Sequence, residues 1–416
     1  LPAVVCKLMT SKNLQLHHSI DCDAKKESNP ICLENGPGGS GAGAVAATLV
    51  VPDDHPTAVH YYDDTRLVVA AQNRVALLDI SGPSGSTTDL GGFPVGERRP
   101  WTIVEVGASG VPAVALTNAM NQGWVLASGG DASPMAVDLP APGIGAAGAG
   151  SGIEGFYLWA LAGPGGGVAR SPRAGGPASR LEAPIADEVT AIAHSSGTLV
   201  VGDIGGGVRM CNPTDGVCKP RNPVMPGRID VIKLFFDDGI ALGGDGVYRS
   251  TVVDLETGRI TGSPLAVPAR VTGPTIDGRY FRHDLFPIGD RCVVFTSEDG
   301  VELAAGDVRR VLVPLDGASG RRALGVHIAP KLGTAGKGGA PNPAIYFAVF
   351  APRDQGGGIY TIDLPAECAS SGGRVGDAGE DSQCHALGQD CTDPVVPCCE
   401  GECVQEPDRK VCRLPL

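Results

Sequence analysis

A pattern of short strands and tight turns recurs seven times along this chain. Each copy has a polar turn, an apolar run, a Gly-rich turn and a second apolar run. The polar turns recur about every 40–50 residues. They are centred on Asp64, Gly110, Glu154, Gly197, Asp238, Asp290 and Asn342. Because the apolar runs are too short for helices and the turn residues tolerate hairpin backbone conformations, the pattern predicts an all-β fold of similar units.

The copies at residues 58–80, 191–210 and 232–255 align best with one another. One four-stranded sheet cannot bury both faces, whereas sheets stacked around an axis bury each other, and a closed ring protects their edges. The repeat therefore resembles the blades of a β-propeller, and seven copies between residues 44 and 367 predict a seven-bladed ring. A β-sandwich or a solenoid is the alternative fold, and six or eight blades are the alternative counts.

Composition and charge narrow the function classes. The chain has 61 Gly and 34 Pro among 416 residues, which suits many tight turns. A net charge of −13 without a basic patch argues against nucleic acid as a partner. No apolar run approaches the roughly 20 residues that span a bilayer, and the excess of Arg over Lys is typical of GC-rich bacterial genomes. The first residue is Leu1, as expected after signal-peptide removal or trimming.

Six of the 13 cysteines lie in the last 33 residues, in the pattern C-x6-C-x6-CC-x3-C-x8-C. So short a segment cannot fold on an apolar core alone, and covalent bridges must replace that core. The spacing and the adjacent cysteines resemble the inhibitor cystine knot (knottin) family. That resemblance implies the pairs Cys384–Cys399, Cys391–Cys403 and Cys398–Cys412. A zinc cluster with His385 is the alternative, although the chain has no CxxC pair.

The other cysteines suggest further disulfides. Two pairs flank turn sequences and are expected to close local loops, namely Cys211–Cys218 and Cys22–Cys32. Cys6 and Cys368 lie near the two ends of the ring, so its closure is expected to pair them, which leaves Cys292 as a buried free thiol. A metal site at His17, His18, Cys22 and Cys32 is the alternative for the N-terminal pair. Such disulfide density predicts an extracellular, periplasmic or cell-surface location.

Polar, Gly-rich stretches divide the chain into five parts. The predicted order is a Cys-containing N-terminal segment (1–35), a Gly-rich linker (36–43), the propeller (44–367), a flexible tether (368–383) and a disulfide-rich, knottin-like C-terminal module (384–416).

Two groups of polar residues are candidates for ligand binding. In the predicted propeller they fall near turns, where side chains from different blades could meet at one mouth of the channel. They are His55, His60, Asp63 and Asp64 in the first repeat, and Arg282, His283 and Asp284 before the sixth. Asp63-Asp64 and Asp237-Asp238 occupy equivalent turns, where Asp is favoured for backbone hydrogen bonds. A structural role for these turns is therefore the competing interpretation, and Trp101, Trp124 and Trp159 are expected to pack between blades rather than to stack on sugars.

No known catalytic or cofactor motif is present in the sequence: G-x-S-x-G, H-E-x-x-H, C-x-x-C-H and a complete EF-hand loop are all missing. The sequence identifies no cofactor, and bound Ca²⁺ or Zn²⁺ is the alternative that it leaves. The sequence favours a secreted or cell-surface protein that binds a protein or glycan and belongs to a larger extracellular assembly. An extracellular hydrolase or lyase with a metal or acid–base site at the propeller mouth is the alternative, since fold alone does not define function.

Overall fold

A computed structural model provides the structure of the chain. It describes residues 47–369, with breaks between some strands, and residues 402–405 and 410–413. The breaks comprise residues 94–100, 106–112, 119, 128–132, 150–154, 164–166, 174, 182–187, 196–197, 235–238, 255, 267–274, 277–278, 281–282, 289–291, 306–307, 316–319 and 335–341.

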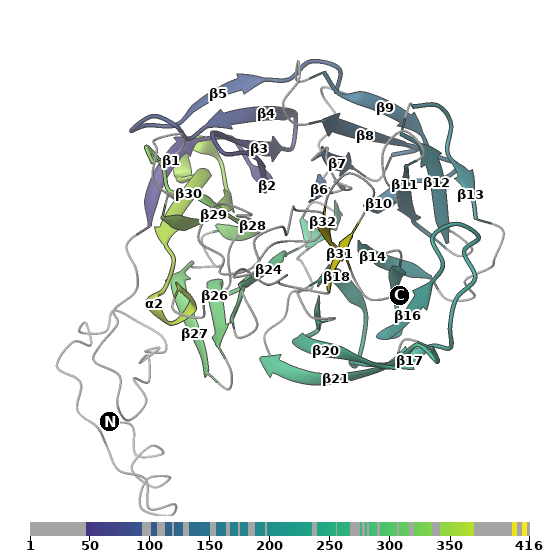
Figure 1. Cartoon of the computed structure of the whole chain (residues 1–416). Coiled ribbons are helices and arrows are strands. Elements are labelled where there is room, and N and C mark those ends of the chain that lie inside the picture. Colours follow the sequence, from purple (N-terminus) through teal and green to yellow (C-terminus); the bar gives the residue numbers. More distant parts are fainter. Residues whose placement is uncertain are drawn as a thin grey trace, which may run out of the picture. The chain divides into compact units, whose positions relative to one another are not determined.

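Seven four-stranded antiparallel sheets, arranged as the blades of a ring, form the main body of the described chain (Figure 1). The first sheet contains β2 (Pro56–Asp63), β3 (Arg66–Ala71), β4 (Arg74–Asp79) and β5 (Ser86–Asp89). The second contains β6 (Thr102–Glu105), β7 (Ala113–Thr117), β8 (Gln122–Ala127) and β9 (Met135–Asp138). The third contains β10 (Gly143–Ala149), β11 (Phe156–Leu161), β12 (Val168–Pro172) and β13 (Ser179–Arg180).

The next three sheets follow in chain order. The fourth contains β14 (Val189–Ser195), β15 (Thr198–Asp203), β16 (Gly207–Cys211) and β17 (Asn222–Pro223). The fifth contains β18 (Ile229–Leu234), β19 (Gly239–Gly244), β20 (Val247–Asp254) and β21 (Arg259–Ala266). The sixth contains β24 (Leu285–Ile288), β25 (Cys292–Ser297), β26 (Gly300–Ala305) and β27 (Val308–Pro314), and the small hairpin β22 (Thr275–Ile276) and β23 (Arg279–Tyr280) precedes it.

The seventh sheet combines strands from both ends of the ring. It contains β28 (Arg322–Pro330), β29 (Pro343–Phe350) and β30 (Gly358–Asp363), and its outermost strand is β1 (Thr48–Pro52). β1 pairs antiparallel with β30, opposite Gly358–Thr361. A short 3₁₀ turn, η3 (Arg353–Gln355), lies between β29 and β30, and the helix α2 (Ala366–Ala369) follows β30. A strand from the start of the ring thus completes its last blade.

The innermost strands make contact in a closed cycle. β2 contacts β6, then β10, β14, β18, β24 and β28 follow in order, and β28 contacts β2. The chain therefore has an all-β, seven-bladed propeller fold, as the repeat predicts. Each of the seven repeat anchors falls between the first and second strand of a different blade, so the phase of the repeat is also confirmed.

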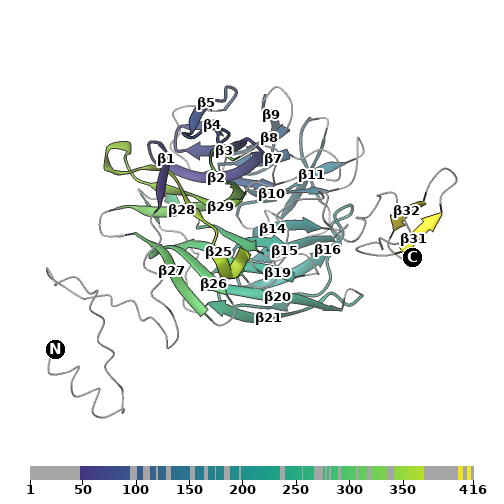
Figure 2. The same cartoon turned by 60° about the vertical axis from the view of Figure 1, so that its left-hand side comes forward.

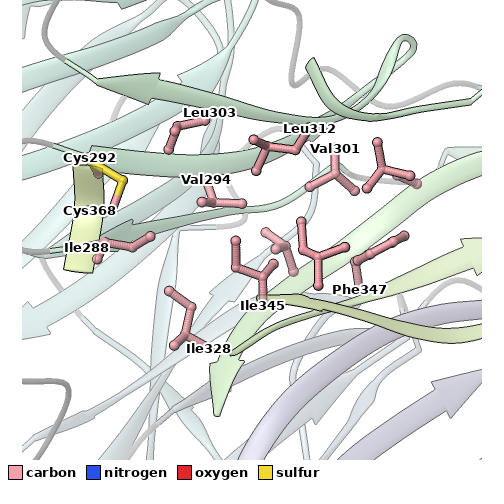
Figure 3. Close-up of a cluster of buried hydrophobic side chains, with 14 of the residues drawn as sticks. Ile288, Cys292, Val294, Val301, Leu303, Leu312, Ile328, Ile345, Phe347 and Cys368 are labelled. Atoms are coloured by element: carbon pink, nitrogen blue, oxygen red, sulfur yellow. A yellow bond between two sulfur atoms is a disulfide. The ribbon is translucent and has the colours of Figure 1, made fainter. Parts of the chain in front are cut away.

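Apolar side chains fill the spaces between neighbouring blades. The largest fully buried side chains include Trp124, Trp159 and Tyr346, and Trp101 packs edge-on against Trp124 with ring centroids 5.4 Å apart. Fully burying one large apolar side chain contributes about 1.5–3 kcal/mol. Between the sixth and seventh blades, Figure 3 shows Val294 and Val301 in the same buried cluster as Ile345 and Phe347.

Two disulfides are present in the described residues. One joins Cys211 to Cys218, as the turn between them predicts. The other joins Cys292 of β25 to Cys368 of α2, which lies beside β25 and β26 (Figure 2), and its sulfurs lie among the buried side chains of Figure 3. The expected pair Cys6–Cys368 and the expected free thiol at Cys292 are therefore wrong. Closing the ring brings Cys368 to the sixth blade, and the sequence alone does not show that neighbour.

Within the range predicted for the C-terminal module, the described residues form one hairpin of β31 (Glu402–Gln405) and β32 (Lys410–Arg413), in which Cys403 stands opposite Cys412. The remaining cysteines of the predicted knot lie outside the described residues, as do Cys6, Cys22 and Cys32. No helix in the described ranges is long and apolar enough to cross a membrane.

Candidate functional site

The predicted ligands Asp63 and Asp64 lie at the turn between β2 and β3. Asp63 accepts hydrogen bonds from Nε of Arg66 (2.8 Å) and from the backbone N–H of Thr65 (3.0 Å). Burial raises the pKa of Asp63, but these hydrogen bonds outweigh it and the pKa is lowered. Asp64 accepts a hydrogen bond from the hydroxyl of Tyr61. Both carboxylates therefore have local partners, as in the structural interpretation of the turn.

The predicted ligands of the first repeat do not meet at one point. His55 precedes β2, with Nδ1 2.9 Å from Asp54 and a left-handed φ of 53°. Asp63 ends β2, which has eight residues. At about 3.3 Å per residue, the two ends of such a strand are more than 20 Å apart. His55 and Asp63 therefore lie at opposite ends of the innermost strand.

His60 lies in the middle of β2 and is buried against the seventh blade. Its ring centroid is 4.0 Å from that of His327, which in turn packs edge-on against Phe286 at 4.5 Å. Burial, with a smaller contribution from Lys233, lowers the pKa of His60 to about 3, and burial beside His60 lowers the pKa of His327 well below its ordinary value. Both rings are neutral at pH 7 and pack as buried aromatic side chains.

The second predicted group lies at the channel. Arg282 is outside the described residues. His283 is fully buried, and its Nδ1 lies 2.8 Å from the carbonyl oxygen of Ala323. Asp284 accepts a hydrogen bond from the backbone N–H of Leu285 (2.9 Å). Both residues precede β24, so they reach the axis where the innermost strands begin.

A chamber occupies the axis at this level, and all seven blades contribute to its wall. The centres of water molecules can occupy a volume of about 60 Å³ within it. In five blades the innermost strand has a β-bulge near its start, which leaves one residue without a partner in the register. Those residues are Thr57, Ile144, Thr190, Asp230 and Gly325, and all except Thr190 line the chamber.

Gly325 shows why one bulge needs glycine. Its φ is +42°, and a Cβ at this position would lie 2.7 Å from Cα of Ala58 and 2.9 Å from the backbone nitrogen of Val59. The seventh and first blades therefore approach so closely at the chamber that only a hydrogen fits between them.

Three charged side chains line the chamber, namely Asp230, Lys233 and Asp284, and each has an oppositely charged neighbour. Nε of Arg228 lies 2.7 Å from Oδ1 of Asp230, whose side chain is fully buried. Nζ of Lys233 lies 3.8 Å from Oδ1 of Asp284, and these side chains are 16% and 21% exposed. Burial raises the pKa of Asp284, although Lys233 opposes the shift. The chamber is therefore polar and has no net charge from these four groups.

The chamber is suited to binding a small polar molecule. Among the described residues, no group of three or more His, Cys, Asp or Glu side chains could hold a metal ion. A water needs about 10–15 Å³ of space measured this way, so the chamber has room for about five water-sized atoms. The chamber is too small to enclose a whole peptide or oligosaccharide.

Sequence reasoning found His283 and Asp284 but missed Lys233 and Asp230 as neighbours. A signal for the latter pair does exist, because they interrupt the otherwise apolar run Ile229–Leu234 of an innermost strand. The sequence places Trp101 between blades, and the structure shows that it also lines the chamber.

Comparison with known proteins identifies the fold and no closer relationship. No protein-family model and no curated protein matches the sequence. The structure resembles the crystal structure of the Myceliophteria thermophila Cps50 (Swd1) β-propeller domain, with a TM-score of 0.56, 11% identity, and 77% of this chain and 99% of that chain covered. It also resembles the WD40 β-propeller domain of Doa1, with a TM-score of 0.50 and 10% identity. That match covers 77% of this chain and 97% of the Doa1 domain chain. These similarities support the seven-bladed propeller.

Proposed function

We propose that the chain is a secreted or cell-surface propeller that binds a protein partner and serves as a subunit of an extracellular assembly. The observation that carries this proposal is the disulfide-closed loop Cys211–Cys218 on the fourth blade, which presents an exposed apolar side chain. Structural disulfides persist in oxidising compartments, and a rigid loop binds a partner at a lower cost in conformational entropy than a mobile one.

Several contacts hold this loop in one conformation. The backbone N–H of Thr214 donates to Oδ1 of Asn212 (2.8 Å), and that of Val217 donates to Oδ1 of Asp215 (2.8 Å). Arg170, from the third blade, donates to the carbonyl oxygen of Thr214 (3.2 Å). Within this fixed loop, Val217 is 60% exposed. The loop therefore offers a preformed apolar contact in a polar frame, as binding loops on rigid scaffolds do.

The WD40 propeller that resembles this chain supports the fold, and the small size of the chamber supports binding on the outer surface. We further propose that residues 384–416 form a knottin-like module. The antiparallel β31 and β32, with Cys403 opposite Cys412, fit such a module because disulfide-rich modules of this size are built around short hairpins.

The test uses chemical crosslinking of the full chain in extracellular and surface fractions of its source cells, followed by direct binding of the purified partner. We expect Val217→Asp to weaken the interaction at least about tenfold. Val308→Asp is the matched control, because Val308 is 62% exposed on the sixth blade. Equal affinity of both variants would contradict a role for the loop, and binding lost on glycosidase treatment but kept after protease treatment would identify a glycan instead.

A further inference from the structure

The outer ends of the fourth and fifth blades form one continuous surface. Their outermost strands, β17 and β21, lie side by side (Figure 1). A Cβ on Gly258, in the turn before β21, would lie 2.5 Å from Cβ of Lys219, which follows the Cys211–Cys218 loop. The side chain of Asn222 donates to the carbonyl oxygen of Gly258 (2.8 Å) and accepts from the backbone N–H of Ile260 (3.2 Å). These contacts fix the disulfide-closed loop of the fourth blade against the turn of the fifth.

Two exposed valines lie on this region. We name it the hairpin surface, and it comprises residues 212–219, Val253 and residues 256–259. Val217 is 60% exposed and Val253 is 53% exposed, and they are two of the five exposed large apolar side chains in the described chain. Val253 precedes Asp254, which stands opposite Arg259 in the register, and Arg259 follows the contact between the two blades.

The two valines are close enough for one partner to cover both. Along the path through the contact between the blades, their Cα atoms are less than about 30 Å apart. A stable protein–protein interface buries about 800 Å² on each partner, and a patch of that area is about 30 Å across. Within the turn of the fifth blade, Asp254 accepts hydrogen bonds from the backbone N–H of Glu256 (2.9 Å) and the hydroxyl of Thr257 (2.6 Å). Both halves of the surface are therefore fixed before a partner binds, which lowers the entropic cost of binding.

The hairpin surface has no net charge although the whole chain carries −13. Six charged side chains lie on it or at its border, three of each sign, namely Arg170, Lys219, Arg259, Asp215, Asp254 and Glu256. None of the six forms an ion pair with another residue in the described ranges. Two copies of an acidic protein repel each other, so a locally neutral surface is where they can approach at low electrostatic cost.

Unpaired charges of both signs also make the surface complementary to itself. In a two-fold dimer, a residue of one copy meets a different residue of the other copy, and the same contact occurs twice. A basic side chain of the hairpin surface can therefore meet an acidic one of the second copy, while the exposed valines lose contact with water.

We propose that two copies of this chain bind each other through the hairpin surface. The inference rests on the proposed function and names a second copy as the protein partner. Val217 and Val253 of each copy pack at the contact, and Lys219 of one copy pairs with Glu256 of the other. The chamber lies where the first strand of each blade begins, whereas the turns after the third strands lie on the opposite face, so the dimer leaves the chamber uncovered.

Sedimentation equilibrium of the full chain tests this contact. We expect a non-covalent dimer at about 100 μM protein, and we expect Val217→Asp and Val253→Asp each to weaken dimerisation at least about tenfold. Val308→Asp is the matched control, because Val308 is 62% exposed but lies on the sixth blade, and this variant is expected to dimerise like the original chain. Circular dichroism establishes that all three variants are folded. A monomeric chain at this concentration, or full dimerisation of the folded Val217→Asp and Val253→Asp chains, would overturn the proposal.

A charge exchange tests the two-fold arrangement. Lys219→Glu and Glu256→Lys each place like charges across the axis, so each variant alone is expected to dimerise at least about tenfold more weakly. An equal mixture of the two variants restores opposite charges at both contacts and is expected to dimerise again. A mixture that stays as dissociated as the separate variants would contradict the arrangement.

The self-association and the proposed function can fail separately. A monomeric chain that loses a crosslinked extracellular partner through Val217→Asp would keep the proposed function and overturn the dimer. A dimer of the purified chain without any crosslinked species in the extracellular and surface fractions would support the hairpin surface and contradict the extracellular assembly.

Discussion

Asp203 is the last residue of β15, and its side chain is only 1% exposed. Its carboxylate is paired both with an arginine side chain and with backbone N–H groups. Arg221 donates to both of its oxygens, at 2.7 and 2.9 Å. The backbone N–H groups of Gly205 and Gly207 each donate at 2.9 Å. Glu302, also fully buried, is held by Arg309 in the sixth blade in the same way. Such carboxylates stabilise the fold only while they are paired, because a buried charge without a partner is strongly unfavourable.

The pairing of Asp203 makes stability depend on pH. Burial raises its pKa, but the hydrogen bonds from Arg221 and Gly207 outweigh burial, and the folded pKa lies below the ordinary 3.8. This stabilisation is therefore present above the unfolded pKa and is lost as pH falls through the folded pKa. We expect Asp203→Asn to lower the free energy of unfolding by about 2–4 kcal/mol at pH 7, and by progressively less as the pH falls below 3.8 toward the lower folded pKa.

Urea denaturation of the two chains at pH 7 and pH 3 measures this difference. Asp354→Asn is the control, because Asp354 is exposed in η3 and its change is expected to leave stability nearly constant at both values. A loss for Asp203→Asn that is equal at both pH values would show that its charge is not the cause.

Residue types alone indicate the candidate site only in part. His283 and Asp284 line the chamber, whereas His60 packs against His327 and Asp63 belongs to a turn. A strand pattern shows that alternate side chains share a face. It does not show whether that face meets a neighbouring blade or the channel, because the answer depends on bulges and on blades that are distant in the sequence. For this reason Lys233 was not recognised as the neighbour of Asp284.

Local elements are predictable here, and distant pairings are not. The seven repeat anchors, polar or Gly residues that fall in phase between the first and second strands of each blade, follow from local chemistry. β1 has only five residues, and its partner β30 lies about 300 residues later. The Cys292–Cys368 bridge likewise joins residues 76 apart in sequence. Nothing local specifies either pairing, and both depend on the ring being closed.

The two disulfides should stabilise the fold to different degrees. Cys292–Cys368 spans 76 residues and Cys211–Cys218 spans 7. In the chain-entropy model the longer loop contributes about 4–5 kcal/mol and the shorter about 2–3 kcal/mol, because a longer closed loop restricts the unfolded chain more. We expect the double substitution Cys292→Ala/Cys368→Ala to lower the free energy of unfolding by more than Cys211→Ala/Cys218→Ala, as measured by urea denaturation. A larger loss for the second variant would contradict this ranking.

At the scale of the whole ring, the seventh blade is held from both sides. β1 pairs with β30 and continues into β2 of the first blade through residues 53–55, so backbone hydrogen bonds join the last blade to the first. The Cys292–Cys368 bridge joins the segment after β30 to the sixth blade. The seventh blade therefore has a backbone attachment to the first blade and a covalent attachment to the sixth.

This arrangement predicts that the two attachments are coupled. Val50 is the buried residue of β1 and packs in the cluster between the first and seventh blades, so Val50→Asp loosens the strand. We expect Val50→Asp together with Cys292→Ala/Cys368→Ala to lower the free energy of unfolding by at least about 1 kcal/mol more than the sum of the separate changes. Urea denaturation of the four chains measures this coupling. Additive losses would show that the two attachments act independently and do not jointly stabilise the seventh blade.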